Sequence, residues 1–301
     1  MIDSLSASAQ AFLTGLAQIN QTLDTAQAQL TTGLKINNVS DAPDEISGLL
    51  QTRNDLTQTQ QISTNLDQVN TEVNTAQSTL QSAVSLVEQA QTLGAQGAND
   101  VNSANTNQNL ADQLGSILQE LVSDANTTVE GRYIFSGDSD QTAPYSIDLT
   151  QQDPVSAYQG SAATRQIQGA DGSLITVSLT AQQIFDSADS TQNVFNSISD
   201  LRQALLNNDS ASISSALSDV ESSGSYLNQQ LAFYGNVQDQ LSSATTYAQN
   251  YTTQLQTQLS GIQDANETQS ITQMTEAETN LQAAMISRAQ MPRTSLFDFL
   301  A

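Results

Sequence analysis

Apolar side chains recur every four and then three residues near both ends of this 301-residue chain. This 4-3 repeat places a narrow apolar seam along a helix, and a lone helix cannot cover such a seam. We therefore expect the two seams to pair with each other, with other copies of the chain, or with both. The residues predicted to form this assembly interface are Leu5, Phe12, Leu16, Ile19, Leu23 and Leu30 near one end and Ile271, Met274, Leu281, Met285, Leu296, Phe297, Phe299 and Leu300 near the other.

Residues 4–32 should form the first helix, with Gly33 as its left-handed C-cap. Ser40 or Asp41 is expected to cap the next helix, whose first turn would contain Pro43, Asp44 and Glu45. The repeat returns at 62–90 and 110–121, and glycines predict helix ends near Gly94 or Gly97 and near Gly131.

Downstream, the 4-3 spacing predicts helices at 194–205 and 213–220. A last long helix is expected to begin near Gly224 and to carry one apolar stripe as far as Ile262. Gln238 interrupts that stripe and weakens its register.

The middle of the chain has a different pattern. Residues 132–189 contain aromatic and β-branched runs separated by prolines and glycines, and segments 164–168 and 174–179 are predicted strands. The Asp171-Gly172 pair between them is typical of a hairpin. The sequence therefore predicts a mainly α fold, in which the N- and C-terminal halves form a long antiparallel helical bundle or coiled coil with a small β-rich inserted domain.

Five segments follow from this organisation. The ends, 1–45 and 269–301, would be coiled-coil polymerisation segments. Residues 46–131 and 190–268 would be the two halves of the helical bundle, and 132–189 the β-rich outer domain. Because an isolated helix with one narrow seam buries little area, we expect roughly the first 30 to 40 and the last 25 to 30 residues to be weakly ordered in a monomer.

Composition excludes several functions. The chain has 7 Lys and Arg residues against 31 Asp and Glu residues, a net charge of −24, which disfavours nucleic acid and anionic membranes as partners. It contains no Cys and no His, so we predict no disulfide, catalytic, cofactor or metal site. An enzyme would have to use Tyr145, Tyr158 and nearby acids, which we instead expect in the core of the β-rich domain. Lys35 is the single lysine.

No apolar run is long enough to span a membrane. The first six residues lack the basic and apolar regions of a cleaved secretory signal.

Three motifs resemble the bacterial flagellin family, and within it the branch at the hook–filament junction (hook-associated protein 3). Residues 31–37 followed by 40–43 (TTGLKIN and SDAP) are similar to the family's first connection. Residues 86–100 are similar to a later helical segment, and 131–137 (GRYIFSG) with Pro144-Tyr145 resembles the entry to the junction protein's outer domain. The ending 295–300 (SLFDFL) also resembles the junction branch, whereas Ser47-Gly48 is closer to filament flagellins.

The resemblance implies a structural subunit rather than an enzyme. It implies export without a cleaved signal peptide, through the flagellar secretion apparatus and with an export chaperone, to an extracellular flagellum. Other copies of the chain, hook-associated proteins and flagellin would be its partners. Gln89, Gln91 and Thr92 depart from the family's charged residues in a region that an animal immune receptor recognises in flagellins, so that recognition is not expected here.

Alternatives stay open at this point. The chain could be the filament flagellin itself, or a non-flagellar coiled-coil interaction protein. Scarcity of positive charge makes five arginines candidate interface anchors, namely Arg53, Arg132, Arg202, Arg288 and Arg293.

Overall fold

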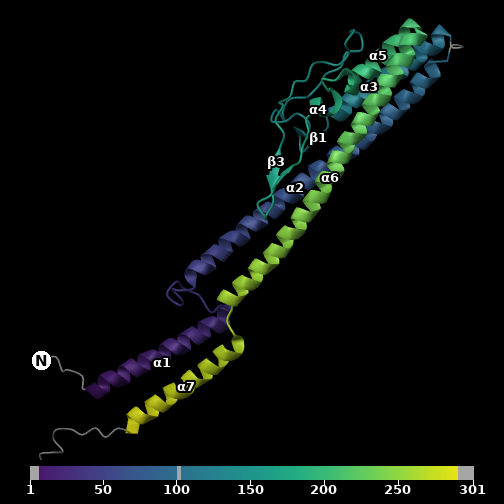
Figure 1. The fold of residues 1–301 in the computed structure, drawn as a ribbon. Coiled ribbons are helices and arrows are strands. Elements are labelled where there is room, and N and C mark those ends of the chain that lie inside the picture. Colours follow the sequence, from purple (N-terminus) through teal and green to yellow (C-terminus); the bar gives the residue numbers. More distant parts are fainter. Residues whose placement is uncertain (1–6, 100–102, 291–301) are drawn as a thin grey trace, which may run out of the picture. The chain divides into compact units, whose positions relative to one another are not determined.

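The computed structural model describes residues 7–99 and 103–290, most of which are helical (Figure 1). The mainly α fold with a small β-rich insert is confirmed. The long helices are α1 (Ala7–Thr32), α2 (Ile46–Gly97), α3 (Ala104–Ala125), α5 (Val194–Asn207), α6 (Ser210–Gln263) and α7 (Glu267–Gln290). A short helix α4 (Ala181–Phe185) and a 3-10 turn η1 (Ser190–Gln192) precede α5.

The insert contains two small antiparallel pairs. Strand β1 (Thr128–Val129) pairs with β2 (Arg132–Tyr133), and β3 (Gln166–Gln168) pairs with β4 (Leu174–Thr176). Positive φ angles at Glu130 and Gly131 form the tight turn that joins β1 to β2. The second pair is the predicted hairpin, and Gly172 adopts a φ of +84° in its turn. Strand pairing therefore begins a few residues before the predicted boundary at 132.

The chain divides into two compact units by its contacts. One contains residues 1–58 and 252–301, and we call its described part the terminal unit. The other contains residues 59–251 and is called the central unit. The finer five-segment division stays a prediction.

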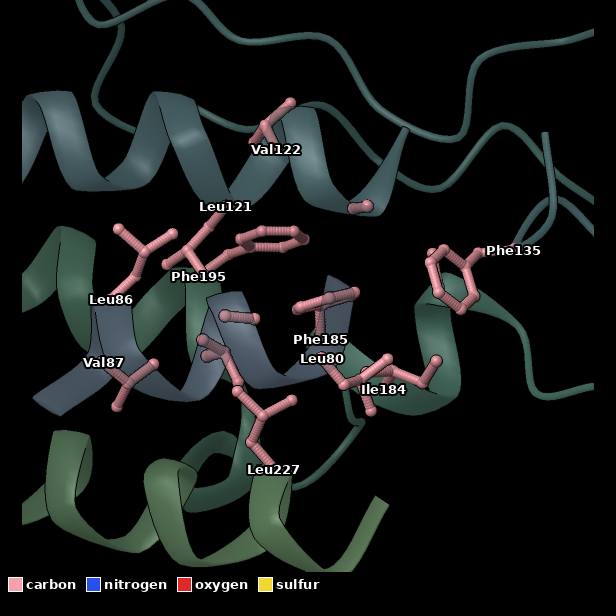
Figure 2. Close-up of a cluster of buried hydrophobic side chains, with 14 of the residues drawn as sticks. Leu80, Leu86, Val87, Leu121, Val122, Phe135, Ile184, Phe185, Phe195 and Leu227 are labelled. Carbon is pink, nitrogen blue, oxygen red and sulfur yellow. The ribbon is translucent and has the colours of Figure 1, made fainter. Parts of the chain in front are cut away.

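Within the central unit, α2, α3, α5 and α6 enclose one apolar core with the insert (Figure 1). Leucine and isoleucine side chains from all these helices are buried, as the 4-3 spacing predicts. Figure 2 shows part of this core, to which α2, α3, α4, α5 and α6 all contribute side chains. Fully buried members include Leu66, Leu80, Leu114, Leu118, Leu121, Ile184, Ile198 and Leu201.

Aromatic rings fill the space where the insert meets the helices. Phe185 stacks on Phe195 with ring centres 5.5 Å apart, and Phe135 contacts Phe185 edge-to-face at 6.4 Å. Tyr234 of α6 contacts Phe135 at 6.4 Å, and its hydroxyl accepts a hydrogen bond from the Leu179 amide. Such ring pairs add favourable energy to the area they bury, so the insert is fixed to the bundle by its own core.

Two predicted helix limits are wrong. Helix α3 ends at Ala125, not near Gly131, because the chain turns into β1. Helix α6 begins at Ser210 and continues through Gly224. A Cβ atom at that position would lie 2.9 Å from Gln91 Nε2 and 3.1 Å from Val87 Cγ1 of α2. Gly224 therefore permits close approach of two helices and does not start one.

The apolar stripe of α6 continues past Gln238, where the sequence predicted an interruption. Val237 is buried in place of Gln238, whose amide instead donates a hydrogen bond to Asn74 of α2. No helix in the described part of the chain is both long enough and apolar enough to cross a membrane.

Candidate assembly surface

Helices α1 and α7 lie side by side in the terminal unit and bring the two predicted seams together (Figure 1). The residues buried in this pair are small: Ala9 and Ala26 of α1, and Ser270 and Ala277 of α7. The Ser270 hydroxyl donates a hydrogen bond to Gln29 Oε1 at 2.9 Å. The pairing of the chain's ends with each other is thus present within one copy.

The larger seam residues are only partly covered by this pairing. Phe12, Leu16, Ile19, Leu23 and Leu30 of α1 and Met274 and Leu281 of α7 are half-buried. Ile271 and Met285, by contrast, are exposed. Leu5, Leu296, Phe297, Phe299 and Leu300 lie outside the described residues. An assembly role for all of these residues stays a prediction.

Further apolar side chains add to this incompletely covered face. Leu13 of α1 and Ile286 of α7 are exposed and lie outside the predicted set of interface residues. A groove of about 410 Å³ runs between the helices, lined by Gly15, Ile19 and Ala277 among others. Contiguous exposed apolar surface is characteristic of interaction sites.

The connection after α1 fixes the base of this helix pair. Gly33 adopts a φ of +71°, which confirms the predicted left-handed cap. Leu34 forms a β-bridge with Asp264, and the Lys35 amide donates to the Gln263 carbonyl at 2.6 Å. The Ala265 amide donates to the Gly33 carbonyl at 2.8 Å. Two segments more than 200 residues apart are therefore joined by backbone hydrogen bonds.

The prediction that Ser40 or Asp41 caps helix α2 is wrong. Asp41 Oδ2 accepts hydrogen bonds from the amides of Asn37 and Asn38, at 2.9 and 2.7 Å, so this carboxylate closes the connection itself. Helix α2 begins at Ile46, and the Glu45 carbonyl accepts the first helical hydrogen bond, from Leu49. Ser40 and Pro43 lie before the helix.

A small core stabilises the same connection. Ile36, Ala42 and Leu49 are buried against Leu259 and Ile262 of α6. Lys35 Nζ lies 2.8 Å from Glu45 Oε1, an exposed ion pair of small energetic value. The first of the family-like motifs therefore holds the chain's two halves in a fixed pairing.

The candidate arginines have different environments. Arg53 Nη2 donates to Gln263 Oε1 at 2.7 Å, and the Arg288 guanidinium lies 5.5 Å from the centre of the Phe12 ring. Arg202 is in the central unit, where its Nε is buried without a hydrogen-bond partner among the described atoms. Arg293 lies outside the described residues.

An ion-pair cluster in the central unit joins the insert to α2. Arg132 Nη2 lies 3.6 Å from Glu72 Oε1, and Arg165 pairs with the other oxygen of the same carboxylate. Glu72 is buried, which makes loss of its partners costly. Arg165 and Glu72 were not predicted as partners, because no local pattern in the sequence links positions 93 residues apart.

The two tyrosines considered for catalysis belong to the core. Tyr145 is buried and contacts Phe195 edge-to-face at 5.0 Å. Burial raises the pKa of its hydroxyl, as does the neighbouring Asp186 carboxylate, which accepts its hydrogen bond at 3.3 Å. Tyr158 is half-buried, and its hydroxyl donates to backbone carbonyls of Phe135 and Ser161. Among the described residues there is no group of acidic side chains that could hold a metal ion.

Comparison with known proteins identifies the N-terminal part of the chain. Residues 4–140, a little under half of the sequence, match the family model of the bacterial flagellin N-terminal helical region. This part of the chain is therefore similar to the flagellin N-terminal region. The resemblance carried by residues 31–43 and 86–100 is thus confirmed, and the match ends just beyond the GRYIFSG run.

Solved structures with the same fold come from flagellar proteins. A protein assigned as a flagellar hook-associated protein from Vibrio parahaemolyticus is 18% identical, with a TM-score of 0.66 over 74% of this chain and 100% of its own. Bacillus cereus FlgL is 20% identical, with a TM-score of 0.56 over 71% and 100%.

A third similar structure is hook-associated protein 3 from Legionella pneumophila. It is 14% identical, with a TM-score of 0.62 over 72% of this chain and 98% of its own. No curated protein sequence matches the chain. At these identities the structural comparisons establish the fold alone, which the chain shares with these flagellar proteins.

Proposed function

We propose that this protein is a structural subunit of the bacterial flagellum, which assembles through its terminal helices at the hook–filament junction. The observation that carries the proposal is the α1–α7 pair, whose seam residues remain half-exposed or exposed in a single copy. A neighbouring pair of helices would cover them and remove apolar area from water, which stabilises association by about 25 cal/mol per Å².

Two kinds of likeness support this function. Residues 4–140 match the flagellin N-terminal helical region, and the solved structures of the same fold include proteins named as hook-associated or FlgL. Its partners would be other copies, hook-associated proteins and filament flagellin. An export chaperone and the flagellar secretion apparatus would deliver it to the cell exterior without a cleaved signal peptide.

Filament flagellin is the second candidate, favoured by the family model itself, which describes flagellin. The GRYIFSG run favours the junction. In the structure it contains Gly131 of the β1–β2 turn, strand β2, and Phe135, which fixes the insert to the bundle.

Deleting the gene in its native host separates the candidates. A junction subunit predicts cells that build hooks but release filament flagellin into the medium, measured by electron microscopy and by immunoblotting of the culture supernatant. The full chain should restore filaments, and a chain without residues 291–301 should not. Normal filaments built from a different, major flagellin in the deleted strain would contradict the junction function. Restoration by the shortened chain would show that residues 291–301 are not needed for assembly, which would contradict their predicted place in the assembly interface.

A further inference from the structure

The central unit carries a groove that the proposed function does not use. It lies between the β3–β4 hairpin and α6, has a volume of about 530 Å³, and contains Leu174 and Tyr247 in its lining. These two are the large hydrophobic side chains that the described central unit exposes, at 68% and 46%. Ile175 and Ala244 beside them are buried in the core. The unit's exposed apolar side chains are thus gathered at one site, which we call the hairpin groove.

Charge at the hairpin groove is negative. Asp171 lines it from the hairpin and Asp239 from α6, and no Lys or Arg is among its lining residues. Hydrogen bonds from the side chain and amide of Ser173 hold the pKa of Asp171 below its usual value. That carboxylate is therefore ionised at neutral pH, and a complementary surface must combine an apolar side chain with a cation.

The terminal unit presents such a surface on α2. Leu50 is 54% exposed, and Arg53 is an exposed residue three positions later, so both lie on one face of the helix. The hydrogen-bond partner of Arg53 is the neutral amide of Gln263, whereas Lys35 is paired with the Glu45 carboxylate. Among the described residues Arg53 therefore combines an exposed apolar neighbour with a positive charge that no carboxylate neutralises.

We propose that the Leu50/Arg53 surface of one copy docks into the hairpin groove of a second copy. Leu50 would contact Leu174 and Tyr247, and Arg53 would lie near the carboxylates of Asp171 and Asp239. The two surfaces differ, so the contact is heterologous, and each copy keeps one of each free to bind another copy. Repetition then produces an open assembly. This inference rests on the proposed function, for which it supplies a second subunit contact away from α1 and α7.

Cysteine cross-linking tests the contact directly, because the natural chain contains no Cys. A tagged chain with Leu50→Cys is mixed with an untagged chain carrying Tyr247→Cys, concentrated, and oxidised mildly. Disulfides require Cα atoms within about 7 Å, so we expect a mixed dimer in at least about tenfold excess over the control. The matched control replaces Tyr247→Cys with Ala232→Cys, an exposed position on the same helix. Equal yields from both pairs would overturn the proposal.

A charge exchange provides the second arm, measured as the concentration at which the protein assembles by sedimentation. Arg53→Glu should raise that concentration several-fold, and Asp239→Arg in the same chain should restore it. If Asp239→Arg failed to restore the assembly concentration, the pairing of Arg53 with Asp239 would be contradicted. The docking would also be contradicted if, in isolated flagella, Tyr247→Cys cross-linked to a protein of different mass and not to a second copy.

The same variants in the deleted strain separate this contact from the proposed function. One outcome would refute the docking and leave the function standing. In it, the deleted strain loses its filaments, the Arg53→Glu chain restores them, and the Leu50→Cys and Tyr247→Cys pair cross-links no more than the control pair. If the deleted strain keeps its filaments, the junction function fails, and the cross-links still decide whether copies pair in this way.

Discussion

Leu121 of α3 and Leu16 of α1 belong to the same kind of 4-3 repeat, but their surroundings differ. Leu121 is fully buried, because α2, α5, α6 and the aromatic insert surround the apolar face of α3. Leu16 is half-buried, since α1 is packed against α7. The comparison teaches that one sequence pattern produces a finished core where several elements converge and an incomplete one where two helices meet. The incomplete core is the part that other copies would finish.

The largest expected effect comes from the finished core. Phe185→Ala removes a buried ring that contacts Phe135 and Phe195, and should lower the free energy of unfolding by about 3–5 kcal/mol. Chemical denaturation followed by circular dichroism measures it. The control is Leu174→Ala, at an exposed position of the same unit, which should change the value by less than about 0.5 kcal/mol. Equal effects would mean that the core is not as closely packed as described.

A smaller effect is expected at Asp124 of α3. Burial raises the pKa of this carboxyl to about 6, above the 3.8 of the unfolded chain, and its Oδ2 atom has no hydrogen-bond partner among the described atoms. The group therefore favours the folded state below pH 3.8, and this contribution is lost as the pH rises through 6. Because the carboxyl is only about half-buried, we expect Asp124→Asn to stabilise the protein by about 1 kcal/mol at pH 8.

Measuring the stability gain of Asp124→Asn at two pH values tests whether the buried charge of Asp124 causes it. The gain from Asp124→Asn should disappear near pH 4, when the carboxyl of the natural chain is also neutral. Asp112→Asn, at an exposed position of the same helix, serves as the control and should show no such dependence. A gain that is equal at both pH values would exclude the buried charge as its source.

The smallest effect on the isolated protein is expected in the seam. Ile19→Asp should reduce the free energy of unfolding of dilute protein by no more than about 1 kcal/mol, because the side chain is half-exposed. It should abolish assembly, where the charge would be buried without a partner at a cost of several kcal/mol. Denaturation and electron microscopy measure the two outcomes.

Asn20→Asp is the matched control for the seam, since it adds the same charge at an exposed neighbouring position. It should leave both stability and assembly nearly unchanged. A large loss of stability for Ile19→Asp in dilute protein would show that the seam is already packed in one copy, and the contrast between the two units would fail.

Patterns within one stretch of sequence predicted the local features correctly. The 4-3 spacing located the long helices, Gly33 marked the end of α1, and Asp171-Gly172 marked the hairpin. Each of these depends on residues a few positions apart, so the chain's own backbone preferences are sufficient. Features that depend on distant partners were missed. Gly224 was misplaced as a helix start because its reason is the close approach of α2. Asp41 is a different case, since its partners are local and a carboxylate there suits a helix cap as well as the closed connection that forms.

The sequence by itself determined that this chain is a set of long helices with apolar seams, a β-rich insert, no Cys or His, and a strong negative charge. Periodicity and composition decide these properties, since they require no knowledge of which elements meet. Only the tertiary structure decided which seams are covered. Burial depends on the number of neighbours that converge on a helix, and this leaves α1 and α7 half-exposed while it encloses Leu121 and Phe185. It also placed Arg165 on Glu72 and gathered Leu174 and Tyr247 at one groove, because such contacts join positions that are distant along the chain.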